Sequence, residues 1–334
     1  MIELSELHDA AQKAFPADKL SPDRDDSWRL VSEMGWLMLR IPEEAGGLGL
    51  GREASSAIHF EMGRVLSRAP LIPAELGLHA VLASEALADK ASWIERIAGG
   101  EYMPLNMLPG TITENDGAFS GTLGGFFEAD MASHLVAALP GCYVLVPVDA
   151  PGVSLVERTL WDRTRRMFDL VLDGFRPDLV LSKGDAAKSM HDLIGPEAHL
   201  ALAADSLGGA NGALAQTVEY LAMRKQFDRP LAMFQALKHR VADLKTRIVA
   251  DEALLWSRAA EAAPDRPGIA ALKALACEDY AFVTEEMIQL HGGIGLTDEH
   301  HCHLFMKRAM LNDRLCGSGD ILFEVAGRNA LAAA

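Results

Sequence analysis

The stretch Arg224-Lys225-Gln226-Phe227-Asp228-Arg229-Pro230 lies between two long segments of helical periodicity. Before it, apolar residues recur along one face of a helix, and after it a second apolar stripe steps by 3, 4, 3, 4 and 7 residues. The members of these stripes are Leu200, Leu207, Leu214, Val218 and Leu221, then Phe234, Leu237, Val241, Leu244, Ile248 and Leu255. A further helix is expected from about 269 to 290, after a break at Pro264 and Pro267. Successive stripes of this kind predict an antiparallel helical bundle.

The segment before the bundle has the pattern of short strands. Apolar runs at 135–139 and 143–148 are separated by Pro140-Gly141, and alternating apolar residues follow at Val153 and Leu155. This period of two is typical of half-buried strands, so a small antiparallel β domain is expected here.

The first hundred residues are predicted to be helical. A helical stripe that includes Trp28 and Val31 ends at Pro42, a glycine-rich turn follows at 46–51, and another helix is expected from 54 to about 66. The fold class is therefore mainly α with a central β domain. We expect an N-terminal α-helical domain at 1–100, a middle β domain at 101–187 and a C-terminal helical bundle at 188–334.

Composition narrows the function. The chain has 334 residues and a formal net charge of −16, which disfavours binding to a nucleic-acid backbone. It contains no apolar run near the roughly 20 residues of a membrane span and no signal-peptide pattern. Its 4 cysteines are scattered, as in reduced cytoplasmic proteins. We expect a cytoplasmic protein with no membrane or nucleic-acid partner, in which a phosphate-bearing ligand needs a local basic cluster.

Three stretches resemble the acyl-CoA dehydrogenase family: 33–49 with its Ile-Pro-Glu-Glu-Ala-Gly-Gly-Leu-Gly, 224–244 with its basic motif, and Gln289-Leu290-His291-Gly292-Gly293-Ile294-Gly295-Leu296-Thr297. The resemblance implies an N-terminal helical domain, a β-barrel-like middle domain and a C-terminal four-helix bundle. It also implies FAD, an acyl-CoA substrate whose α,β bond is dehydrogenated, and an electron-transferring flavoprotein or similar acceptor. A homo- or hetero-tetramer is expected, and the short chain resembles the smaller subunits of heteromeric acyl-CoA dehydrogenases.

The resemblance implies that seven residues of this chain contact FAD, largely across a subunit interface. An arginine fork suits a pyrophosphate, a phenylalanine offers a flat face for a ring, and paired glycines let the backbone approach closely. The seven residues are Arg224, Gln226, Phe227, Gln235, Gln289, Gly292 and Gly293. The alternative is that the basic residues favour a helix dipole and the glycines only stop a helix.

The main difference between this sequence and the family lies at the position of the catalytic base. The reaction needs a base for the α proton, and the family's usual glutamate place, before Gly317-Ser318, is occupied by Cys316. Other members place the base near the position of Ala198, so Glu197 and Asp205 are the candidates, each of which could equally be a solvated helix residue. Segments 106–110 and 126–128 also lack the family's flavin-ring motifs.

Two other functions stay open: a catalytically incompetent structural subunit of an acyl-CoA dehydrogenase complex, and a flavin monooxygenase on the same fold. No metal site is predicted. Histidines 300, 301 and 303 flank Cys302, but their spacing lacks an i, i+4 pair with a carboxylate, and His291 is assigned no role.

Overall fold

The protein is described here from a computed structural model that covers residues 3–333. Its contacts divide the chain into two compact units, each assembled from separated stretches. Within the described residues, we call them the helical unit (3–22, 53–67 and 199–333) and the mixed unit (23–52 and 68–198). Both contributions of the N-terminal hundred residues are helical, but they belong to different units.

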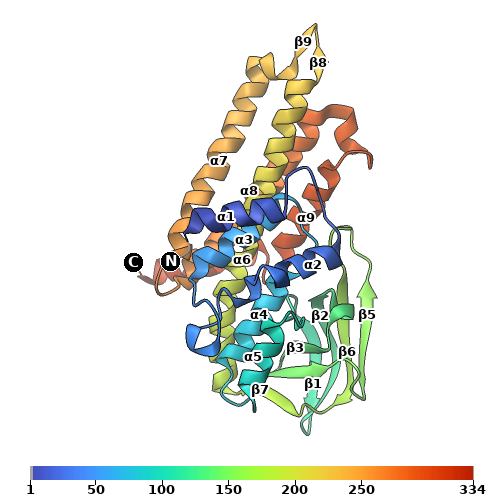
Figure 1. Cartoon of the computed structure of the whole chain (residues 1–334), viewed down its shortest axis with the longest axis vertical. Coiled ribbons are helices and arrows are strands. Elements are labelled where there is room, and N and C mark those ends of the chain that lie inside the picture. Colours follow the sequence, from blue (N-terminus) through green and yellow to red (C-terminus); the bar gives the residue numbers. More distant parts are fainter. Residues whose placement is uncertain (1–2, 334) are drawn as a thin grey trace. The chain divides into compact units, whose positions relative to one another are not determined.

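The helical unit is built around the long helices that flank the basic motif. The later part of α6, α7 and α8 run side by side, with the β8–β9 hairpin at one end (Figure 1). Its elements are α1 (Leu4–Ala14), nearly all of α3 (Arg52–Arg64), the later part of α6 (Asp185–Met223), β8 (Lys225–Gln226), β9 (Arg229–Pro230), η4 (Leu231–Met233), α7 (Gln235–Ala259), α8 (Arg266–His291), η5 (Gly292–Leu296), α9 (Cys302–Arg314) and α10 (Gly319–Ala333).

The apolar stripes form the core of this unit. Leu244 and Ile248 of α7 and Tyr280 of α8 are fully or almost fully buried in one cluster. The helices α3 and α6 approach each other closely at a glycine. A Cβ on Gly208 would lie 1.9 Å from the carbonyl oxygen of Phe60, so only glycine fits there.

The mixed unit carries strands β1 to β7 and several helices. The strands form a four-stranded sheet in the order β1-β2-β6-β5 and a three-stranded sheet in the order β3-β4-β7, and every pairing is antiparallel. The elements are α2 (Arg24–Glu33), η1 (Trp36–Met38), η2 (Glu43–Ala45), α4 (Leu71–Ala83), α5 (Lys90–Ala98), β1 (Gly110–Asn115), β2 (Ala118–Phe127), η3 (Ala129–Met131), β3 (His134–Leu139), β4 (Cys142–Pro147), β5 (Val153–Arg158), β6 (Met167–Phe175), β7 (Leu179–Lys183) and the start of α6.

Turn residues explain the hairpins of this unit. Asp116 and Gly117 both have positive φ between β1 and β2, as a type I′ turn requires. Pro140-Gly141 joins β3 to β4, where Leu139 pairs with Cys142.

The predicted fold class, mainly α with a central β region, is confirmed. The expected strands at 135–139 and 143–148 match β3 and β4. The prediction that Val218 belongs to the buried stripe is wrong. Val218 is 44% exposed, while Leu214 and Leu221 on either side of it are buried. Within residues 3–333, no helix is long and apolar enough to cross a membrane.

Candidate functional site

The basic motif forms an exposed hairpin between α6 and α7. Phe227 and Asp228 make the turn, with φ values of +53° and +63°. Positive φ at both central positions is the type I′ geometry that glycine and asparagine usually occupy, so Phe227 is held in a disfavoured backbone conformation. Its side chain is 86% exposed. The hairpin also carries Arg229, whose guanidinium lies 4.1 Å from the ring centroid of Phe234.

The glycine motif forms an open turn at the end of α8. The helix ends at His291, and Gly292 has a φ of +66°. A Cβ added to Gly292 or to Gly293 would meet nothing within 4 Å. The backbone here is therefore open to another group, and Gln289 on the last turn of α8 is also exposed.

A tyrosine brings the two motifs to the same end of the helical unit. The hydroxyl of Tyr220, one turn before Arg224, donates to the carbonyl oxygen of His291 at 3.2 Å. The Tyr220 and His291 rings stack with centroids 4.3 Å apart. Gln235 begins α7 just after the hairpin.

All seven predicted cofactor residues are exposed in this chain. A basic hairpin with an exposed aromatic ring and an open glycine turn fits a phosphate-bearing group with a flat ring that approaches from outside the core. The assignment of these seven residues to the cofactor stays a prediction.

Cys316 lies in a loop that backbone contacts hold in place. The Lys273 ammonium, from the first half of α8, is fully buried and donates to the carbonyl oxygens of Asp313 at 2.7 Å and Gly317 at 2.6 Å. His199 Nε2 lies 2.9 Å from the Cys316 carbonyl oxygen. Cys316 itself has a φ of +53°. The residue is half-buried, and desolvation of its thiol, opposed by the charge of Lys273, raises the thiol pKa to about 12, so the thiol is protonated at neutral pH.

Glu197, the first candidate base, is enclosed by two arginines within the mixed unit. Arg52 Nε donates to Glu197 Oε1 at 2.8 Å, and Arg40 donates to both carboxylate oxygens at 3.0 and 3.3 Å. Burial opposes ionisation, but Arg40, His79 and Arg52 outweigh it and lower the pKa of Glu197 to about 2. A carboxylate with this pKa is a weak base at neutral pH.

Asp205, the second candidate, lies in a buried polar cluster of the helical unit. Asn312 Nδ2 donates to Asp205 Oδ2 at 2.7 Å, and Arg308 Nη1 lies 3.4 Å from Asp205 Oδ1. Arg308 and Asn312 are fully buried. These contacts favour a packing role for Asp205, and its role as base, like that of Glu197, stays a prediction.

The segments that lack flavin-ring motifs are tied into the mixed unit. Asn106 Oδ1 accepts from the Ala138 N–H at 2.9 Å. Glu128 is buried and accepts from Arg24 at 3.0 Å and from the Arg166 N–H at 2.8 Å. Sequence reasoning missed these partners, as it missed Arg40, Arg52 and Lys273.

The helical bundle, the antiparallel sheets and the exposed basic hairpin define a protein of helix–β–helix order whose outward-facing site suits a phosphate-bearing cofactor. Comparison with known protein families identifies the family. The model described as "Acyl-CoA dehydrogenase, N-terminal domain" matches residues 5–101, and that described as "Acyl-CoA dehydrogenase, C-terminal domain" matches residues 197–331. The chain belongs to the acyl-CoA dehydrogenase family. It is an oxidoreductase of the type that acts on CH–CH groups, with FAD as its cofactor.

Individual relatives agree. Acyl-CoA dehydrogenase IpdE2 of Mycobacterium tuberculosis is 34% identical over 303 residues, which cover 90% of this chain and 85% of that protein. Among solved structures, the Tcur3481-Tcur3483 steroid ACAD variant is 26% identical, with a TM-score of 0.85 and 99% of both chains covered. Butyryl-CoA dehydrogenase from Megasphaera elsdenii is similar in fold, with a TM-score of 0.85, 20% identity and coverage of 98% and 97%.

Proposed function

We propose that this chain takes part in the FAD-dependent α,β-dehydrogenation of an acyl-CoA thioester as one subunit of a heteromer, whose partner supplies the catalytic carboxylate. The observation that carries the proposal is Cys316. It stands where the family's glutamate is expected, and burial keeps its thiol protonated. A protonated thiol cannot remove the α proton of the substrate.

The other candidate carboxylates of this chain support the same proposal. Glu197 is ion-paired with Arg40 and Arg52. Asp205 is bonded to Asn312 and lies beside Arg308. A base is expected to have a pKa near the working pH and to reach the substrate, and each of these groups is already committed to protein partners. A partner chain with a free glutamate would complete the site.

The exposed residues of the helical unit support a role at a shared cofactor site. When bound, FAD would accept the hydride from the β carbon, and this chain would contribute binding and orientation. Arg224 and Gln226 would hold the phosphates, Phe227 would cover a ring, and Gly292 and Gly293 would admit the cofactor to the backbone. Because these groups face outward, we infer that the cofactor is held jointly with a neighbouring subunit in a tetramer.

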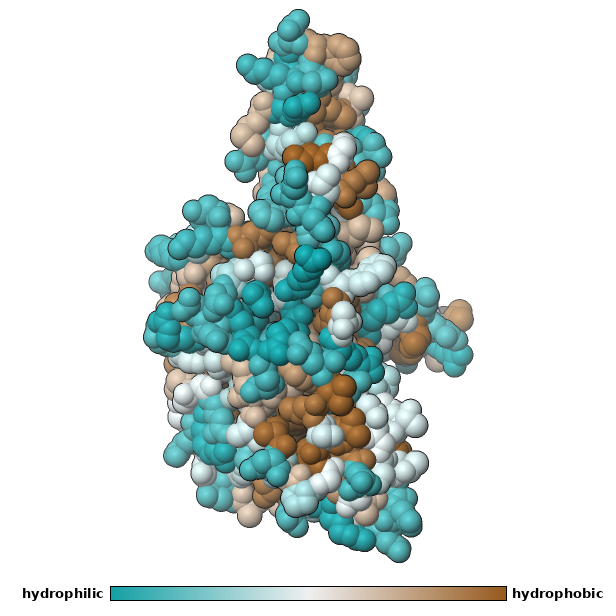
Figure 2. Space-filling model, turned by 90° about the vertical axis from the view of Figure 1, so that its right-hand side faces the viewer, coloured by the Kyte–Doolittle hydropathy of each residue, from teal (hydrophilic) through white to brown (hydrophobic). Residues whose placement is uncertain are grey.

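Exposed apolar side chains are consistent with assembly. Figure 2 shows hydrophobic residues gathered into a patch on the lower part of the face drawn, within mostly hydrophilic surroundings. Phe227, Leu296 and Trp161 are 86%, 80% and 75% exposed in the isolated chain. A contiguous exposed apolar patch, rather than a single exposed side chain, is what marks an interaction site.

A bulky, steroid-linked acyl chain is our proposed substrate class, with an electron-transferring flavoprotein or similar protein as acceptor. The name of the Tcur3481-Tcur3483 steroid ACAD gives two components and a steroid substrate class for that protein. The present chain matches it along 99% of both lengths, which supports a similar role here.

The test is the visible absorption spectrum of the purified chain, with flavin released by denaturation and counted per chain. We expect far less than one FAD per chain, and no bleaching of added FAD by steroid-linked or straight-chain acyl-CoA thioesters. Adding a longer homologue with an intact glutamate should restore both flavin binding and bleaching.

One FAD per chain and full bleaching by the chain alone would overturn the heteromer. Glu197→Gln and Asp205→Asn would then identify the base. A complex that binds FAD but never bleaches would favour the structural subunit, and oxygen consumption tied to substrate would favour the monooxygenase.

A further inference from the structure

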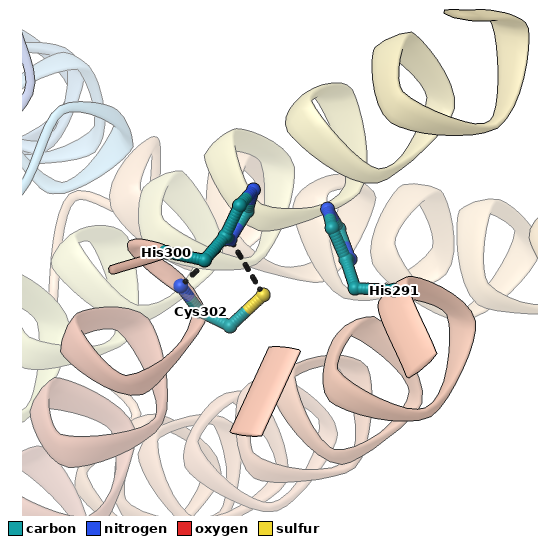
Figure 3. A group of neighbouring side chains, drawn as sticks. All are labelled: His291, His300 and Cys302. Atoms are coloured by element: carbon teal, nitrogen blue, oxygen red, sulfur yellow. Dashed lines mark hydrogen bonds between the residues drawn. The ribbon is translucent and has the colours of Figure 1, made fainter. Parts of the chain in front are cut away.

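Two histidines and a cysteine meet where α8 connects to α9. His291 ends α8, Cys302 begins α9, and His300 lies in the connection between them. One ligand atom from each residue lies within 4.8 Å of the others. Figure 3 shows the two imidazole rings side by side, with His300 turned toward the backbone nitrogen and the sulfur of Cys302. Sequence spacing alone did not predict this group, because His291 comes from the preceding helix.

His291 is oriented as a metal ligand. Its Nδ1 lies 2.7 Å from the carbonyl oxygen of Met287, one helical turn back, so this nitrogen carries the proton and donates it. Its Nε2 is therefore the nitrogen with a free lone pair. That atom is buried and has no hydrogen-bond partner, and the residue is only 3% exposed. A backbone carbonyl that holds one imidazole nitrogen, with the other left free, is the usual arrangement behind metal-binding histidines.

The unpaired nitrogen is costly without a ligand. A buried acceptor without a partner costs about 1–3 kcal/mol. The stacked ring of Tyr220, with its centroid 4.3 Å from that of His291, cannot satisfy it. A cation bound between the three side chains would accept the lone pair of His291 Nε2.

His300 and Cys302 supply the other two ligands. His300 Nδ1 lies 3.0 Å from Cys302 Sγ, and Cys302 is fully buried. His300 is only half-buried, which leaves a path for an ion from solvent. Burial raises the pKa of the Cys302 thiol to about 12, so without a cation the sulfur keeps its proton.

We propose that His291, His300 and Cys302 bind one Zn²⁺ ion, with water in the fourth position. Two imidazoles and a thiolate are ligands that zinc prefers, at about 2.0–2.1 Å for nitrogen and 2.3 Å for sulfur. Tetrahedral bonds of that length place the ligand atoms roughly 3.3–3.7 Å apart, so the side chains need to adjust by only about 1 Å. On binding, the Cys302 thiol loses its proton to solvent and the sulfur bonds to the metal.

The proposed ion would link the C-terminal end of α8 to the N-terminal end of α9 and so hold the connection that contains Gly292 and Gly293. The proposal is independent of the reaction proposed above, because it concerns only residues of this chain's helical unit.

The experiment is metal titration of the full-length chain, first stripped with a chelator and then given Zn²⁺ in competition with a chromophoric chelator. We expect one Zn²⁺ per chain, with the same stoichiometry whether or not FAD is present, and release of one proton from Cys302. Replacement with Co²⁺ should give a thiolate-to-metal charge-transfer absorption.

Cys302→Ser should abolish the charge-transfer band and weaken Zn²⁺ binding at least 100-fold. His300→Gln, at a half-buried position that tolerates the change, should weaken binding to a similar extent even if Cys302→Ser folds poorly. His301→Gln is the matched control: this exposed neighbour lies outside the group and should bind zinc like the unchanged chain. Failure of the unchanged chain to bind Zn²⁺ at micromolar concentration, or equal binding by His300→Gln, would overturn the proposal.

Discussion

The carboxylate of Glu197 accepts a hydrogen bond from Arg52 Nε over 2.8 Å, and the two side chains are only 9% and 16% exposed. Glu197 lies next to the place where some family members are expected to carry the base, yet its surroundings are those of a structural ion pair. The distinction between the two roles can be measured through stability.

Glu197→Gln is expected to lower the free energy of unfolding by about 3 kcal/mol at pH 7, because it removes the carboxylate charge that Arg40 and Arg52 both contact. The pKa of Glu197 is lowered to about 2, so the ion pair contributes fully above pH 4.5 and its contribution is lost as pH falls toward 2. Urea unfolding at pH 7 and pH 3 would measure this. The exposed Glu285→Gln is the control and should change stability by less than about 0.5 kcal/mol. A loss of stability that is the same at both pH values would contradict the ion-pair account.

Asp251→Asn is expected to stabilise the protein at alkaline pH. Burial and the neighbouring Asp279 raise the pKa of Asp251 to about 7. The contribution of Asp251 to the free energy of unfolding is therefore fully present below pH 3.8 and is lost as the pH rises to about 7. At roughly 1.4 kcal/mol per pKa unit, the rise from 3.8 to about 7 corresponds to a gain on the order of 4 kcal/mol at pH 8 and a smaller one at pH 5. Thermal unfolding at both pH values measures it, with the exposed Asp243→Asn as control. An equal effect at both pH values would mean that Asp251 does not titrate in this range.

Gly208→Ala tests the close approach of α3 and α6. Its Cβ would lie 1.9 Å from the Phe60 carbonyl oxygen, so the helices must separate, and we expect a loss of about 2–3 kcal/mol. Gly327→Ala in α10 is the matched control, since a Cβ there meets nothing within 4 Å. Alanine should stabilise that helix by up to about 1 kcal/mol. Denaturant titration of both variants measures the difference, and equal effects would refute the packing argument.

Phe227→Asn separates folding from cofactor binding. Because Phe227 is 86% exposed and has positive φ, asparagine should leave the unfolding temperature of the isolated chain unchanged or slightly higher. In the assembled complex, FAD retained per chain after desalting should fall several-fold. Leu331→Asn removes another exposed apolar side chain, 80% exposed in α10, and should leave flavin retention unchanged. Full FAD retention by Phe227→Asn would remove this residue from the proposed cofactor face.

The Cys316 thiol is expected to be unreactive in the folded protein. Burial raises its pKa to about 12, so less than a thousandth of it is thiolate at pH 8. Iodoacetamide at pH 8 should modify it at least 100-fold more slowly than in the chain unfolded in urea, where all 4 cysteines react. Cys316→Ser should leave the kcat/KM of the assembled complex within twofold. Rapid labelling of the folded chain would show that the sulfur is ionised and available as a base.

The sequence predicted those parts of the fold that depend on local periodicity. Leu244 and Ile248 are core residues because a helix repeats every 3.6 residues, and this can be read without knowing the partners. Val218 was placed in the same stripe but is exposed, although Leu221 further along α6 is buried, because helical spacing alone does not show how wide a face the neighbouring helices cover.

The electrostatics of the candidate site could not be predicted in this way. The partners of Glu197 lie 157 and 145 residues away in the chain, at Arg40 and Arg52, so no local pattern signals them. The turn at Phe227 could not be predicted from the sequence either, because its type I′ geometry is formed without the glycine or asparagine that usually signals such a turn.

The buried ammonium of Lys273 has a consequence for how the family's chemistry can change. It fixes the loop around residue 316 through main-chain oxygens, which every amino acid possesses, and His199 does the same at Cys316 itself. The shape of the loop is thus uncoupled from the side chain it displays. The side chain at position 316 can therefore change between a carboxylate and a thiol without loss of the hydrogen bonds that hold the loop backbone. A Cys316→Glu variant should accordingly keep the same loop conformation.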